Sequence, residues 1–102
     1  MKKLLIASAL VATAGLAHAG GDAAAGEQKA AACNACHGVG GNSTIAANPI
    51  LAGQHRSYLV QALNAYKNGT RTNPIMKGMA AGLSDQDIED LAVYFASQDG
   101  LK

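Results

Sequence analysis

The sequence lacks an excess of charge of either sign, since 8 Lys and Arg stand against 7 Asp and Glu, for a formal net charge of +1. It therefore lacks the basic field that nucleic-acid binding requires. After the first 20 residues it also lacks a second long hydrophobic run, which excludes a polytopic membrane protein. No short repeat is present and 49% of the residues are apolar, so collagen-like and disordered chains are excluded. The 102 residues fit one domain.

The N-terminal segment has the pattern of a secretory signal. Two lysines give it a positive start, and Leu4–Leu16 is an apolar run of 13 residues. An Ala-His-Ala sequence then supplies small residues where a signal peptidase inspects the chain, which predicts cleavage after Ala19. A membrane anchor is the alternative, but a helix of 13 residues is about 20 Å long, shorter than the ~30 Å hydrocarbon core. We therefore expect residues 1–19 to be removed and residues 20–102 to form an exported domain.

The predicted mature domain has few residues with which to build a core. Among residues 20–102, Val, Ile, Leu, Met, Phe and Tyr together number 19, and Trp is absent. A domain of this size with a thin core often depends on a disulfide, a metal or a cofactor. Export permits a disulfide, but the chain has only 2 Cys.

Two Ala-rich or apolar patterns predict helices in the first two thirds of the chain. Asp22 is a candidate N-cap for a helix over residues 23–32, within which Gly26 indicates a close helix crossing. Apolar residues at helical spacing predict a second helix over residues 55–67, ended by Gly69.

The third predicted helix carries the clearest start signal. Ser84, followed three residues later by Asp87, resembles a capping box, and the helix is expected to end before Asp99. Residues 38–54 and 70–82 are rich in Gly, Asn and Pro and are expected to be loops. No segment alternates with a period of two, so the expected fold class is all-α.

The strongest chemical signal is Cys33-Asn34-Ala35-Cys36-His37. The pattern C-x-x-C-H is the attachment signal of c-type haem. Two thiols three residues apart near the end of a helix face the same side, where they can add to the two vinyl groups of a haem and form thioethers. The histidine that follows is then held beneath the iron as an axial ligand.

Three other interpretations of this motif are weaker. A thioredoxin-like redox pair needs a preceding strand and a following helix, whereas here a predicted helix precedes and a Gly-rich loop follows. A zinc site needs further ligands, and beyond residue 19 the only other His besides His37 is His55. A disulfide between Cys33 and Cys36 would close so short a loop that it would stabilise the fold very little.

A haem that carries electrons needs a second axial ligand, for which Met76, Met79 and His55 are the candidates. The pairing of Met with His raises the reduction potential in cytochromes c. The two methionines lie in a segment that can wrap around the haem edge, and their spacing alone does not decide between them. His55 is better explained as a residue at a helix start.

Much of the chain resembles the class I c-type cytochromes of the bacterial periplasm, above all the small c-553 group and one half of the dihaem c-4 group. The resemblance covers Asp22–Gln98 and is carried by CNACH, NPILAGQ and PIMKGMAAGLSDQDIEDLAVYFASQ. It implies a cytochrome c-like fold with three main helices wrapped around one covalently bound haem c.

The resemblance also implies roles for individual residues. The ligand Met of that family lies seven residues before the hydrophobic position that precedes Ser-Asp, which is Leu83 here. Met76 is therefore the implied axial ligand, with Met79 as a packing residue or an alternative ligand. Pro49 matches the proline whose carbonyl accepts the proton of the axial histidine, and Leu51 matches an apolar residue on the haem face.

The function implied is that of a soluble periplasmic electron carrier, not an enzyme, whose iron cycles between Fe(II) and Fe(III). The expected partners are transient redox proteins, such as a cytochrome bc complex, a terminal oxidase or a periplasmic reductase, without nucleic acid or stable membrane insertion. Arg71 is expected either to bind a haem propionate or to be a solvated loop residue. The alternatives are a haem-bearing subunit of a larger oxidoreductase and a haem sensor or enzyme with an open iron site. The absence of a catalytic acid–base cluster argues against the open site.

Overall fold

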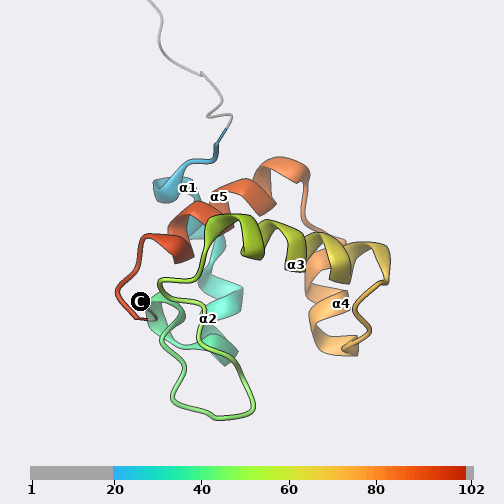
Figure 1. Ribbon diagram of the computed structural model, residues 1–102, viewed down its shortest axis with the longest axis horizontal. Helices are drawn as coiled ribbons and strands as arrows, with labels where there is room; N and C mark the ends of the chain where they lie inside the picture. Colours follow the sequence, from blue (N-terminus) through green and yellow to red (C-terminus); the bar gives the residue numbers. More distant parts are fainter. Residues whose placement is uncertain (1–19, 101–102) are drawn as a thin grey trace, which may run out of the picture.

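The computed structural model describes residues 20–100, and within that range every regular element is a helix (Figure 1). The elements are α1 Ala23–Lys29, α2 Ala31–His37, the 3-10 helix η1 Val39–Gly41, α3 Arg56–Asn68, α4 Pro74–Ala81 and α5 Asp85–Ala96. The all-α prediction is therefore confirmed. None of these helices is long and apolar enough to span a membrane. The predicted secretory signal lies outside the described residues.

The predicted start and end signals of the helices are present. The Asp22 carboxylate accepts a hydrogen bond from the N–H of Ala24 at 3.0 Å and caps α1. Ser84 and Asp87 form a full capping box at the start of α5, with side-chain-to-backbone bonds of 3.0 and 2.9 Å. Gly69 ends α3 in the left-handed conformation, with φ of 88°, which glycine adopts without a steric penalty.

The prediction of a loop over residues 70–82 is wrong, because α4 lies within it. The carboxamide oxygen of Asn73 accepts hydrogen bonds from the N–H groups of Ile75 and Met76, both at 3.0 Å. Pro74 occupies the first helical turn, where its missing N–H costs nothing and its fixed φ suits a helix. Asn and Pro, which suggested a loop, therefore act as start signals.

The helix predicted over residues 23–32 is in fact two helices that meet at Ala30. The backbone of Ala30 has φ −73° and ψ −7°, which turns the chain while its N–H still bonds to the Gly26 carbonyl at 2.9 Å. The second helix, α2, continues through the CNACH motif and ends at His37. Residues 33, 36 and 37 therefore lie on one helical face, because three- and four-residue spacings are neighbours on a helix.

The core forms where α5 crosses α1 and packs along α3, as Figure 1 shows, with α4 attached against α3. The predicted close crossing at Gly26 is confirmed, since a Cβ at that position would lie 2.0 Å from the Asp90 carbonyl oxygen and 2.7 Å from the Tyr94 Cβ. The main buried cluster combines small and large apolar residues from the α1–α2 junction, α3 and α5: Ala30, Leu59, Leu91, Ala92, Tyr94 and Phe95.

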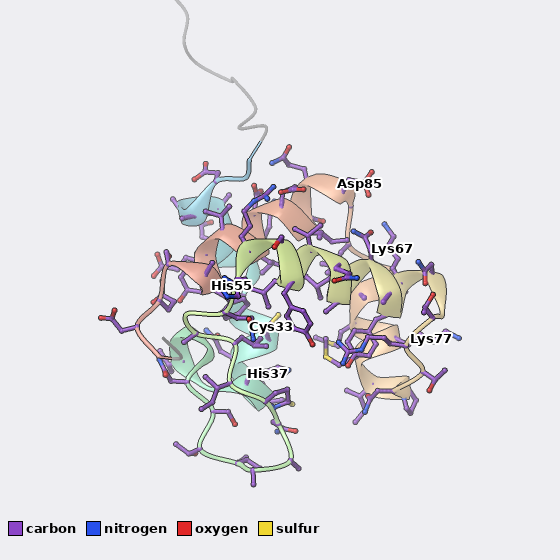
Figure 2. The ribbon with its side chains drawn as sticks, in the orientation of Figure 1. Cys33, His37, His55, Lys67, Lys77 and Asp85 are labelled. Carbon is purple, nitrogen blue, oxygen red and sulfur yellow. The ribbon has the colours of Figure 1, made fainter. Side chains whose placement is uncertain are left out.

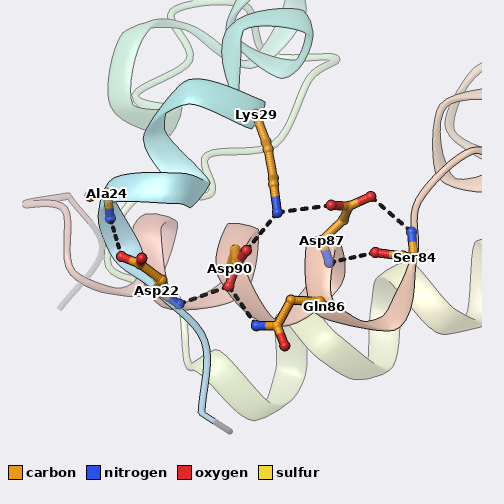
Figure 3. A network of polar contacts seen from close by, with 7 residues as sticks. All are labelled: Asp22, Ala24, Lys29, Ser84, Gln86, Asp87 and Asp90. Atoms are coloured by element: carbon orange, nitrogen blue, oxygen red, sulfur yellow. Dashed lines mark hydrogen bonds and ion pairs between the residues drawn. The ribbon is translucent and has the colours of Figure 1, made fainter. Parts of the chain in front are cut away.

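A polar network reinforces the α1–α5 crossing (Figure 3). Lys29 on α1 pairs with Asp90 at 2.6 Å and with Asp87 at 2.8 Å. The Asp90 carboxylate, whose side chain is only 3% exposed, also accepts hydrogen bonds from the N–H of Asp22 and the amide of Gln86, both at 2.8 Å. A buried carboxylate is tolerated when it is paired and hydrogen-bonded in this way.

The network shifts the pKa values of its members in opposite directions. The hydrogen bond from Lys29 lowers the pKa of Asp87 to about 2, assisted by the N–H of Ser84. Burial works to raise the pKa of Asp90, but its bonds from Lys29, Gln86 and the Asp22 N–H outweigh burial, so this pKa is lowered. The same contacts raise the pKa of Lys29.

Substitution of Lys29 by Met is expected to reduce the free energy of unfolding by about 1–2 kcal/mol at neutral pH, between the effects of breaking an exposed and a buried ion pair. A lowered carboxyl pKa stabilises the fold above the unfolded value of about 3.9 and ceases to do so as pH falls through the folded value. The wild-type protein should lose this contribution between about pH 4 and pH 2, and K29M should show a weaker acid dependence over that range.

Urea unfolding at several pH values, followed by circular dichroism, measures both effects. The matched control is Lys77→Met, because Lys77 is an exposed lysine on α4 outside the network. Equal unfolding free energies for K29M and K77M at pH 7 would contradict the assigned role of Lys29.

Candidate functional site

A cavity of about 410 Å³ lies between α2, α3, α4, α5 and the segment from Ala47 to Gln54. Its lining is mostly apolar. It brings together the residues that the sequence singled out for cofactor binding, except the ligand candidate His55, namely Cys33, Cys36, His37, Pro49, Leu51, Arg71, Met76 and Met79. A mostly apolar cavity with a few convergent polar groups is the usual form of a cofactor site.

The motif helix supplies one wall of the cavity. Cys33 and His37, one helical turn apart on α2, lie close together in Figure 2. Cys33 is half-buried, and burial raises the pKa of its thiol, whereas Cys36 is exposed. Cys33 and Cys36 are not joined to each other by a disulfide. His37 is buried, with 7% of its surface exposed.

The loop after η1 fixes the orientation of the His37 ring. His37 Nδ1 lies 2.8 Å from the carbonyl oxygen of Pro49. Because a carbonyl can only accept, Nδ1 is the donor in this bond, and in the neutral ring the lone pair is then on Nε2. The amide of Asn48 donates to the Cys36 carbonyl at 2.9 Å, so adjacent loop residues bind adjacent motif residues. Sequence reasoning missed Asn48, although its place beside Pro49 is the signal that would have suggested it.

Helix α4 brings both methionines to the same cavity. Met76 is half-buried, and Met79 is 41% exposed. Their three-residue spacing places them on neighbouring positions of one helical face. His55, the third ligand candidate, is not among the residues that line the cavity and occupies the N-cap position of α3.

Leu51 and Arg71 also reach the cavity. Leu51 is half-buried and belongs to the apolar shell around the main core cluster. The Arg71 guanidinium lies 4.9 Å from the centre of the Tyr66 ring and donates to the Tyr58 hydroxyl at 3.4 Å. The pairing of Arg71 with Tyr66 had no signal in the sequence pattern, because it depends on how the chain turns after α3.

The structure bears on the other interpretations of the motif. The residue range 20–100 contains no strand before Cys33, and a thioredoxin-like pair would need one. In that same range, no group of three or more His, Cys, Asp and Glu side chains is close enough to hold a metal ion, which gives no support to a zinc site. The donor set at the cavity is instead two thiols, one imidazole and two thioethers.

Residues 23–99 match the family model described as cytochrome c. The chain belongs to the cytochrome c family. It is 52% identical over 99 residues to cytochrome c4 of Pseudomonas aeruginosa, and the matched region covers 96% of this chain and 49% of that relative. It is 46% identical over 82 residues to cytochrome c-554(548) of Halomonas halodenitrificans, and the matched region covers 78% of this chain and 99% of that relative.

A solved structure shows the same fold. Reduced recombinant cytochrome c4 from Pseudomonas stutzeri superposes with a TM-score of 0.75 at 48% sequence identity, covering 79% of this chain and 47% of the other. The chain thus spans about half the length of the cytochrome c4 relatives that it matches. The predicted class I c-type cytochrome and its all-helical fold are confirmed.

Haem c is the covalently bound cofactor of this family, and this chain carries one. The cavity fits it chemically, because the CNACH thiols, the imidazole and the methionine thioethers face a space that is otherwise lined by apolar side chains. Those donors are the ones that haem attachment and axial ligation require.

Proposed function

We propose that this cytochrome c is an electron carrier whose iron alternates between the ferrous and ferric states without binding a substrate. The observation that carries the proposal is the convergence of His37 from α2 and Met76 from α4 on one apolar cavity. A haem with both axial positions filled has no open position for a reactant, and its remaining chemistry is one-electron transfer.

The cofactor-binding residues have distinct roles in this proposal. Cys33 and Cys36 form the two thioether bonds, and His37 Nε2 and the Met76 sulfur are the axial ligands. The alternative ligand, Met79, lines the same cavity three residues further along α4. The motif and the presence of all five residues in the lining of one cavity support these roles.

Neighbouring residues tune and protect the site. The Pro49 carbonyl accepts a hydrogen bond from the Nδ1–H of His37. This bond fixes the orientation of the ring and makes Nε2 a more basic ligand for iron. Leu51 and the apolar lining exclude water, which strengthens electrostatic interactions inside the cavity. Arg71, at the cavity wall, pairs with a carboxylate of the cofactor.

The proposed location of the protein is the periplasm, after removal of residues 1–19. This is supported by the charged, apolar and small-residue pattern of that segment. The proposed partners are redox proteins that dock transiently, of the kind of a respiratory cytochrome complex, a terminal oxidase or a periplasmic reductase. Exposed apolar side chains suit such a contact, among them Val39 and Ile75, which are 84% and 69% exposed.

The proposal is tested on the protein produced with the cell's haem-attachment machinery. Mass spectrometry should show one haem added to the chain, and optical spectra should show reversible oxidation and reduction without binding of added carbon monoxide. Cys36→Ser should prevent formation of one thioether while leaving the fold of the other elements unchanged. A chain with two free thiols and no haem, or a haem that binds carbon monoxide readily, would contradict the proposal.

A further inference from the structure

The turn that ends α3 places Arg71 at the rim of the cavity. Gly69, in the left-handed conformation, bonds through its N–H to the Tyr66 carbonyl at 3.3 Å. Two residues later, the N–H of Arg71 donates to the Ala65 carbonyl at 2.9 Å. The backbone of Arg71 is therefore tied to the last turn of the same helix that carries Tyr66, which fixes where its side chain starts.

The side chain of Arg71 is held as well. Its guanidinium lies over the face of Tyr66, 4.9 Å from the ring centre, and one of its N–H groups points to the Tyr58 hydroxyl at 3.4 Å. Cations are attracted to the faces of aromatic rings, and the planar guanidinium also stacks on them. Both tyrosines lie on α3 and, like Arg71, line the cavity, so the stacked pair forms part of the cavity wall.

Among residues 20–100, Arg71 is the only permanently charged side chain that lines this cavity. The ion pairs that the structure shows within residues 20–100 involve Lys29 and Arg56, and none involves Arg71. A guanidinium presents a rigid fork of donors that matches a carboxylate. The geometry therefore provides a fixed cation, without a protein carboxylate, at the rim of an apolar site.

We infer that Tyr66 is a positioning residue that holds Arg71 in place to receive a carboxylate of the bound haem. This inference rests on the proposed function, because the carboxylate belongs to the cofactor. Stacking on Tyr66 restricts the rotamers of Arg71 before the carboxylate arrives, so less conformational entropy is lost when the pair forms. A carboxylate of a docking protein has the same chemistry and is the competing source.

The experiment measures the reduction potential of the purified, haem-loaded full chain in Y66F, Y66L, R71Q and the double variant Y66L/R71Q. An unpaired carboxylate near the iron favours the ferric form, so R71Q is expected to lower the potential. Y66L is also expected to lower the potential. Y66F keeps the ring face and is expected to have the wild-type potential. In the R71Q background, Y66L should cause no further shift.

Several results would overturn the inference. They are a wild-type potential in Y66L, a Y66L shift that persists in the R71Q background, or an R71Q effect that appears only when a redox partner is bound. The last would assign the carboxylate to the partner. If Y66L does not accumulate as haem-loaded protein, the reduction potential of R71K is measured instead. Lysine keeps the charge of Arg71 but lacks the planar group that stacks on Tyr66. A wild-type potential in R71K would also overturn the inference. Failure to attach haem at all contradicts the proposed function instead.

Discussion

Substitution of Met76 by Ala is expected to remove the long-wavelength absorption band that accompanies a thioether bond to ferric haem, while the haem stays covalently attached. The reduction potential should fall by on the order of 100 mV or more, because Met with His raises the potential and axial ligation spans a range of roughly 0.8 V. Optical spectra of the oxidised protein and potentiometric titration measure the two effects.

Met79→Ala is the matched control, because Met79 lines the same cavity three residues further along α4. It should keep the absorption band and a potential near that of the wild type. The half-burial of Met76, against 41% exposure of Met79, is consistent with this difference. If M79A loses the band and M76A keeps it, the ligand assignment is wrong and the two methionines exchange roles.

Substitution of Gly26 by Ala is expected to lower the free energy of unfolding by about 2 kcal/mol. The new Cβ would lie 2.0 Å from the Asp90 carbonyl oxygen, and because this is a backbone atom, α1 and α5 would have to move apart. Overpacking of this kind typically costs about 1–3 kcal/mol and occasionally more, which exceeds the gain of up to about 1 kcal/mol in helix propensity. Denaturant unfolding of the haem-loaded protein provides the measurement.

Gly78→Ala isolates the propensity term for this comparison. Gly78 also lies inside a helix, α4, but no atom lies within 4 Å of the Cβ that would be added there. We expect this variant to be as stable as the wild type or more stable by about 0.5–1 kcal/mol. A loss of stability in G78A as large as that in G26A would show that the crossing geometry is not the cause.

The parts of the fold that follow from local chemistry could be predicted from the sequence. The capping box of Ser84, the cap at Asp22 and the left-handed end at Gly69 each depend on residues only a few positions apart. Gly26 indicated a close crossing because glycine within an Ala-rich helix lowers the stability of the helix and needs another reason to be there.

The parts that sequence reasoning missed depend on competition between signals or on tertiary contacts. Asn73 and Pro74 are as common in loops as at helix starts, and only the capping geometry shows that they begin α4. Tyr94 packs against Gly26 at the crossing, whereas Phe95 reaches Gly41 and the cavity. Two neighbouring residues point in different directions here because a helix turns by about 100° per residue.

The site was predictable as a set of residues but not as a geometry. Spacing identified CNACH, because the attachment of haem demands that pattern. Residue type identified the two methionines, because a thioether pairs with His as an axial ligand in cytochromes c. The stacking of Arg71 on Tyr66 and the bond from Asn48 to the Cys36 carbonyl depend on the paths of two connecting segments, which residue type alone does not determine.

The polar network between α1 and α5 has a consequence for the order of events during biosynthesis. Asp90 bonds to Asp22 and Lys29, from which it is separated by 68 and 61 positions. Contacts between such distant parts of a chain form late, since a long segment must first be made and its ends brought together. While the polypeptide is being made, the cysteines of the motif have emerged before the helix that closes the domain exists. The thiol of Cys33, which packs against the core in the folded domain, is thus more accessible to the apparatus that joins it to the porphyrin before the C-terminal helix docks.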